Sequence, residues 1–106
     1  MKSLEMVLQE VRDLLQLEES VTVRIKPLKS TLARLSLTKR VLTLDPLVLN
    51  LDEDLIFYIL THELAHLKAN TPYHTPSFWR EVKRVYNLED AKTIEERIFK
   101  ALKAQR

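Results

Sequence analysis

The sequence contains no cysteine, no glycine and no long apolar run. Without cysteine there is no disulfide framework that would argue for secretion, and no thiolate that could act as a nucleophile or a metal ligand. A membrane-spanning helix needs about 18 or more apolar residues in succession, so none is expected. The polar start MKSLEMVLQEVRD also lacks the apolar centre of a signal peptide. These absences predict a cytoplasmic protein with no membrane span.

The charges are nearly balanced, with 17 Lys and Arg against 15 Asp and Glu, for a net charge of +2. They alternate along the chain instead of forming a basic block, so no nucleic-acid partner is expected. The hydrophobic share of 45% in 106 residues suffices for one core, which predicts a single domain over 1–106. A charged share of 30% with few Met, Asn and Gln resembles thermophile proteins, so a thermophilic source is a hypothesis.

All three histidines of the chain lie in the segment HELAHLKANTPYH. His62 and His66 are four residues apart, so on a helix both imidazoles lie on one face and can bind one metal ion. Glu63 lies beside them, where a carboxylate can reach a metal-activated water as general base. Beyond a turn at 71–72, His74 can return to supply a third ligand. Three protein ligands leave one position open, which is typical of a catalytic zinc site.

Two other interpretations of this segment compete with catalytic zinc. HELAH could be an ordinary amphipathic helix whose histidines only pack, but the glutamate and the third histidine in the same segment favour a metal site. A structural zinc usually completes its tetrahedron with cysteine, which this chain lacks. The sequence therefore predicts hydrolysis of peptide bonds, in which Glu63 takes a proton from a zinc-activated water and passes it to the leaving amine.

The segment 52–82, in which HELAH is followed by His74 and then by FWREV, resembles the minigluzincins. These are small soluble HExxH zinc metallopeptidases related to the YgjP-like and SprT-like peptidases and to the catalytic domains of the membrane peptidases HtpX and CAAX prenyl protease. The spacing between His66 and His74 is longer than in the YgjP pattern, which favours the minigluzincins. The resemblance implies that His62, His66 and His74 bind Zn²⁺, that Glu63 is the catalytic base, and that the substrate is a peptide or protein.

The resemblance also implies a latent enzyme, because C-terminal segments block the active site of minigluzincins. Here the segment 88–106 is the candidate, and its amphipathic part could also be exchanged between two chains in a homodimer. A helix that simply packs on its own domain is the alternative. Two other functions remain open: a non-catalytic zinc-binding or regulatory domain, and a SprT-like nucleic-acid-associated protease that would use Arg80, Lys83, Arg84 and the basic C-terminal end.

Hydrophobic periodicity predicts an α+β fold. A backing helix over 3–17 with Ser3 as N-cap precedes three short strands around 21–25, 35–37 and 41–44, expected to form an antiparallel meander. A long helix should begin after Asp52 and carry the HELAH residues, a further helix should begin at Thr75 and Pro76, and a last helix should begin at a capping box of Thr93 and Glu96.

Three further expectations concern the surroundings of the metal. The strand 40–45 is expected to be an edge strand that pairs with an extended substrate, so that Pro at Thr43 or Leu44 would impair cleavage more than folding. Phe78 and Trp79 are expected to pack in the core and to hold His74 over the metal. The oxyanion of the transition state needs a donor, for which the candidates are Tyr73, Arg80 and Tyr86.

Overall fold

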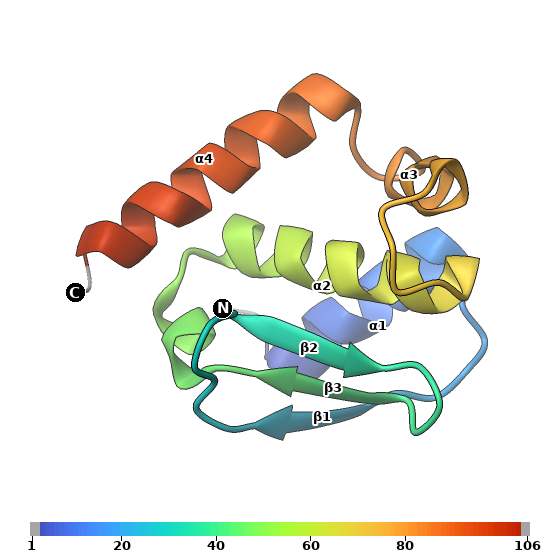
Figure 1. Cartoon of the computed structure of the whole chain (residues 1–106), viewed down its shortest axis with the longest axis horizontal. Coiled ribbons are helices and arrows are strands. Elements are labelled where there is room, and N and C mark those ends of the chain that lie inside the picture. The colour runs from blue at the N-terminus through green and yellow to red at the C-terminus, as the bar shows by residue number, and fades with distance from the viewer. Residues whose placement is uncertain (1–2, 105–106) are drawn as a thin grey trace.

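The computed structural model describes residues 3–104, which form four α-helices, one 3-10 helix and a three-stranded sheet. The elements in chain order are α1 (Leu4–Leu15), β1 (Thr22–Ile25), β2 (Ala33–Ser36), β3 (Val41–Leu44), η1 (Pro46–Asn50), α2 (Glu53–Ala69), α3 (Pro76–Val82) and α4 (Leu88–Ala104). Figure 1 shows α2 as the central layer, with the sheet on one side of it and α4 on the other. The predicted α+β class and the order of helices and strands are confirmed.

The order of the strands differs from the predicted meander. The spatial order is β1-β3-β2, with β1 parallel to β3 and β2 antiparallel to it. The loop 26–32 carries the chain past β3 instead of turning back as a hairpin, whereas a tight turn at 37–40 joins β2 to β3. Arg40 adopts the left-handed conformation in that turn, with a φ of 55°. The expectations of an antiparallel meander and of an edge strand at 40–45 are therefore wrong, because β3 is paired on both sides.

The first helix begins and ends with recognisable caps. The hydroxyl of Ser3 accepts a hydrogen bond from the backbone N–H of Met6, which confirms Ser3 as the N-cap. Gln16 ends the helix in a left-handed conformation. The buried face recurs at helical spacing, through Val7, Leu8, Val11 and Leu15.

The central helix α2 begins after Asp52, as predicted, although the side chain of Asp52 makes no capping hydrogen bond. Its apolar side chains are buried on several faces, since the sheet, α1, α3 and α4 all pack against it. A helix enclosed in this way cannot be displaced without disrupting the core. The histidine pair near its C-terminal end is thus carried by a helix that is packed on several sides.

The predicted start is confirmed for α3 and is wrong for α4. Thr75 caps α3 by accepting a hydrogen bond from the N–H of Phe78, and Pro76 follows as its first residue, as predicted. By contrast, the start of α4 at a Thr93 capping box is wrong. The side chain of Asn87 accepts a hydrogen bond from the N–H of Asp90, so the helix already begins at Leu88.

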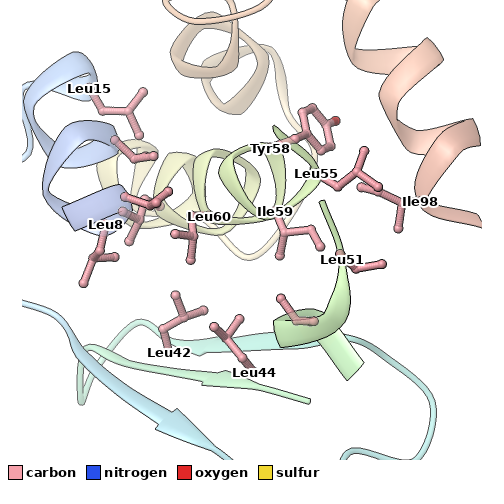
Figure 2. Close-up of a cluster of buried hydrophobic side chains, with 14 of the residues drawn as sticks. Leu8, Leu15, Leu42, Leu44, Leu51, Leu55, Tyr58, Ile59, Leu60 and Ile98 are labelled. Carbon is pink, nitrogen blue, oxygen red and sulfur yellow. The ribbon is translucent and has the colours of Figure 1, made fainter. Parts of the chain in front are cut away.

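The main hydrophobic core lies between the sheet and the helices (Figure 2). Leu42 and Leu44 of β3 and Leu60 of α2 are fully buried in it. The C-terminal helix contributes as well, since Ile98 is only 8% exposed and lies beside Leu55. The helix α4 is therefore part of the core of its own chain. Within residues 3–104, no helix is long and apolar enough to cross a membrane.

Asp45 ties the sheet to the 3-10 helix, and its loss should weaken the fold. Its carboxylate accepts hydrogen bonds from the N–H groups of Leu28 at 2.8 Å and Leu47 at 2.9 Å, and these bonds lower the pKa of Asp45. A folded-state pKa below the ordinary value of 3.8 means that this stabilisation is present above that value and is lost as the pH falls through the folded-state pKa.

We expect Asp45→Asn to lower the thermal midpoint at neutral pH, because the amide can accept with one oxygen only. The difference in thermal midpoint between the variant and the parent protein should become smaller as the pH falls below 3.8. Thermal melting followed by circular dichroism over that pH range measures both effects, with the exposed Asp52→Asn as control. A difference that is independent of pH would contradict the assignment.

Candidate metal centre

The C-terminal half of α2 brings two histidines and a glutamate to one end of a cleft. His62 and His66 lie one helical turn apart on the same face, with ring centroids 5.2 Å apart. Asn70 then ends α2 in a left-handed conformation with a φ of 54°, which redirects the chain. The loop 71–75 runs back toward the helix and returns His74 to the other two histidines.

The three imidazoles converge on one point. One nitrogen from each ring lies within 4.8 Å of the others, and the ring centroid of His74 is 5.1 Å from those of both His62 and His66. The Nε2 atoms of His62 and His74 are 3.2 Å apart. Zinc–nitrogen bonds of about 2.0–2.1 Å in a tetrahedron place ligand atoms about 3.3 Å apart. The predicted ligand set is therefore brought together with a spacing that fits one small divalent ion.

A backbone hydrogen bond orients one of these rings. The Nδ1 atom of His66 lies 2.9 Å from the carbonyl oxygen of Thr71, which can only accept. Nδ1 therefore carries the proton, and the lone pair of Nε2 is left for a metal. Such outer contacts fix the tautomer and the orientation of metal-binding histidines.

The ring of Phe78 contacts all three histidine rings. It is fully buried and stacks on His66 with centroids 4.2 Å apart, and it contacts His62 and His74 edge-on at 5.0 Å. Trp79 is half-buried and lies 6.2 Å from the ring of His74. The prediction that these two aromatic residues hold His74 in place is thus supported by their contacts, and Phe78 supports the whole cluster.

Burial shifts the pKa values of His62, His66 and Glu63. It lowers the pKa of His62 to about 4, helped by the charges that His66 and His74 would carry, so the His62 ring is neutral at physiological pH. Burial also lowers the pKa of His66, although its bond to Thr71 opposes the shift. The pKa of Glu63 is raised to about 7 by burial. A cation held by the neighbouring histidines would favour the carboxylate and reverse part of this rise.

A cleft of about 190 Å³ opens beside the histidines. One wall comes from the segment that leads into β2, the floor from α2, and the far rim from α4. Its lining residues are Thr31, Leu32, Ala33, Tyr58, Ile59, His62, Glu63 and Glu95. His62 of the metal site and the candidate base Glu63 thus line one cavity, which is bordered by the C-terminal helix.

Tyr58 and Glu95, which also line this cleft, were not predicted from the sequence as site residues. Tyr58 lies one turn before His62, so its spacing could have indicated it, but nothing local links Glu95 to the site. None of the three oxyanion candidates lines this cleft. Tyr73 is 71% exposed, Arg80 is exposed, and Tyr86 packs on Phe57 and lines a different hollow.

Comparison with known proteins agrees with this geometry. The family model described as "YgjP-like, metallopeptidase domain" matches residues 1–98. The solved structure of abylysin from Pyrococcus abyssi, described as a metallopeptidase zymogen, superposes with a TM-score of 0.92 at 52% identity, covering 95% of this chain and 96% of that one.

Two further relatives come from Methanocaldococcus jannaschii. Jannalysin, also described as a metallopeptidase zymogen, superposes with a TM-score of 0.87 at 31% identity, over 96% of this chain and 99% of its own. An uncharacterised protein of the same organism is 31% identical over 102 residues, which is 95% of this chain and 93% of the relative. At these shares, both solved structures match most of α4.

If the three histidines form one site, the protein should bind one equivalent of metal, and His74→Ala should weaken binding. Loss of a residue that only contacts a metal ligand typically lowers metal affinity by about 10- to 100-fold. Because His74→Ala removes a direct ligand, we expect a larger loss of metal affinity. Mass spectrometry of dialysed, zinc-loaded protein and competition with a chelator measure stoichiometry and affinity. The neighbouring exposed residue provides a matched control, Tyr73→Ala, which should bind as the parent does. Equal affinities would exclude His74 from the site.

Proposed function

The chain belongs to the YgjP-like metallopeptidase family, and on this premise we propose that it is a zinc-dependent endopeptidase of the minigluzincin type. In this proposal His62, His66 and His74 hold the metal and Glu63 is the general base. The observation that carries it is the convergence of three imidazole nitrogens within 4.8 Å at the edge of the cleft that Glu63 lines. The family assignment favours this function over a non-catalytic zinc-binding domain or a SprT-like nucleic-acid-associated protease.

Bound zinc would supply a Lewis acid that polarises a water and the peptide carbonyl. The chain's own residues would do the rest. Glu63 lines the cleft beside the histidines, and as a carboxylate, the form that a bound cation would favour, it can accept a proton from water and return it to the leaving amine. Three neutral imidazoles leave the ion its full positive charge, which suits it to this role. Imidazole ligands also accept other divalent ions, so the preference for zinc is part of the proposal.

The extended substrate is proposed to pair with β2, in place of the strand 40–45. β2 is an edge strand, and the residues leading into it form one wall of the cleft. The N–H of Asp45 donates to the carbonyl of Leu32, so in this antiparallel ladder Ala33 and Leu44 form a pair without mutual hydrogen bonds. The N–H of Ala33 therefore points away from β3, toward the open edge, where a peptide backbone can accept it.

The proposed latency rests on where α4 lies. This helix places Glu95 at the rim of the cleft, and Arg97 pairs with Asp54 of α2 at 2.6 Å. Abylysin and jannalysin are described as zymogens, and both solved structures cover most of α4. We therefore take α4 to be the latency segment within 88–106, which closes the cleft of its own chain while Ile98 packs in the core. Exchange of α4 between two copies remains a prediction.

Weakening the ion pair between α4 and α2 should raise peptidase activity. Arg97→Glu replaces the ion pair with two like charges, and an exposed pair of this kind contributes up to about 1 kcal/mol, so activity should rise by up to about 5-fold. Cleavage of a quenched fluorescent peptide library by zinc-loaded protein measures it. Adding Asp54→Arg restores a pair and should restore latency.

The same loosened variant tests the catalytic base. Adding Glu63→Gln to Arg97→Glu should reduce cleavage by about 100-fold or more while the metal content stays at one, since the amide cannot accept the proton. Metal-dependent cleavage that survives this substitution would refute the role of Glu63.

A proline at Ala33 should impair substrate binding more than folding. It removes an outward-facing N–H, and the loss of one such hydrogen bond should lower kcat/KM by up to about 10-fold in the Arg97→Glu background. Arg34→Pro is the matched control, because the N–H of Arg34 faces β3 and its loss should lower the thermal midpoint sharply. Unchanged kcat/KM in a folded Ala33→Pro variant would rule out pairing at this edge.

A further inference from the structure

Tyr58 is held in the cleft by the same helix that carries the metal-binding histidines. It precedes His62 by one turn, and the two ring centroids are 6.1 Å apart. The residue is only 2% exposed, and the ring of Tyr86 packs edge-on against it at 5.2 Å. A side chain fixed in this way presents its hydroxyl at a defined position, which is the condition for a preorganised hydrogen-bond donor.

The hydroxyl of Tyr58 is engaged by the latency helix. It donates a hydrogen bond of 2.6 Å to the carboxylate of Glu95, and both residues line the cleft together with His62 and Glu63. This length is typical of a bond between a hydroxyl and a charged oxygen. Glu95 belongs to α4 and is otherwise exposed, whereas Tyr58 belongs to the buried floor. Movement of α4 would thus take away the acceptor and leave the donor in place.

We propose that Tyr58 is a further catalytic residue, which donates a hydrogen bond to the carbonyl oxygen of the bound peptide, and that Glu95 occupies this donor while the cleft is closed. This inference rests on the proposed peptidase function. The carboxylate of Glu95 then lies where the carbonyl oxygen of the substrate would accept the hydrogen bond from Tyr58. Glu63 transfers the proton of the attacking water, and Tyr58 donates a hydrogen bond without giving up its own proton.

The electrostatics of Tyr58 suit a donor that stays protonated. Burial raises its pKa well above the ordinary value of 10.0, and the hydrogen bond and charge of Glu95 raise it further. Both effects favour the protonated hydroxyl, which is the form that donates a hydrogen bond. Among the residues that line the cleft, Tyr58 also supplies what the candidates Tyr73, Arg80 and Tyr86 do not, namely a neutral donor on the floor beside His62.

The test is a cycle of four full-length, zinc-loaded proteins: the parent, Glu95→Ala, Tyr58→Phe and the double variant. Either single substitution breaks the contact between Tyr58 and Glu95. If this contact only holds α4 in place, both substitutions should raise activity equally. The inference predicts instead that Glu95→Ala raises peptide cleavage by about 10-fold or more, the effect of losing a charge-assisted bond, while Tyr58→Phe does not. In the double variant kcat/KM should be at least 10-fold below that of Glu95→Ala, and up to about 1000-fold, as for loss of an oxyanion donor.

A matched control is available next to Tyr58. Tyr86→Phe removes a hydroxyl from the adjoining ring, whose residue lines a different hollow, and it should leave cleavage unchanged in the Glu95→Ala background. Metal content and thermal melting of every variant separate a catalytic loss from unfolding.

Equal kcat/KM in Glu95→Ala and the double variant would overturn the role of Tyr58 and leave the peptidase function standing. Absence of metal-dependent cleavage in Glu95→Ala and in Arg97→Glu alike, with one zinc bound, would overturn the proposed function and this inference with it.

Discussion

The packing of Phe78 against three imidazoles is the contact on which the rest of the site depends. His62 and His66 are aligned by the helix itself, but His74 reaches them only because α3 docks on α2. Phe78 makes that docking specific, since one fully buried ring touches all three histidines. A flat, rigid ring suits this position, because it supports the imidazoles without offering a competing ligand. The arrangement of the three imidazoles is thus supported by an apolar contact.

Local regularity explains which parts of the site could be predicted from the sequence. The i, i+4 relation of His62 and His66 is a property of any helix, and the caps at Ser3 and Thr75 act over a few residues. Strand order is different, because alternation identifies a strand and says nothing about its neighbours. The loop 26–32 could equally have formed a hairpin. Its actual path depends on Asp45, whose carboxylate holds the N–H of Leu28 from 17 residues away in the sequence.

The strand order also changes where the substrate would bind. With β3 in the centre of the sheet, Thr43 and Leu44 are buried and their backbone is engaged, so a proline there would damage the fold itself. The open edge near the cleft is formed by β2 instead, and the residues at the start of β2 form a wall of the cleft. Pairing of the peptide with an edge strand stays a prediction, and the strand to which it applies is now β2. The same long-range argument explains why Glu95 was missed, since its partner Tyr58 is 37 residues away.

The helix α4 contributes to the core and also borders the cleft, which gives it two roles if the proposed latency holds. A domain of this size has little apolar surface to spare, so Ile98 and Ala91 complete the core while Glu95 lies at the cleft. Full removal of α4 would expose core residues as well as the site, so activation by deletion would come at the expense of stability. A pivot that keeps Ile98 buried and withdraws Glu95 would open the cleft at lower energetic cost. In the proposed mechanism of latency, the polar contacts of α4 with Tyr58 and Asp54 would be the ones that such a pivot breaks.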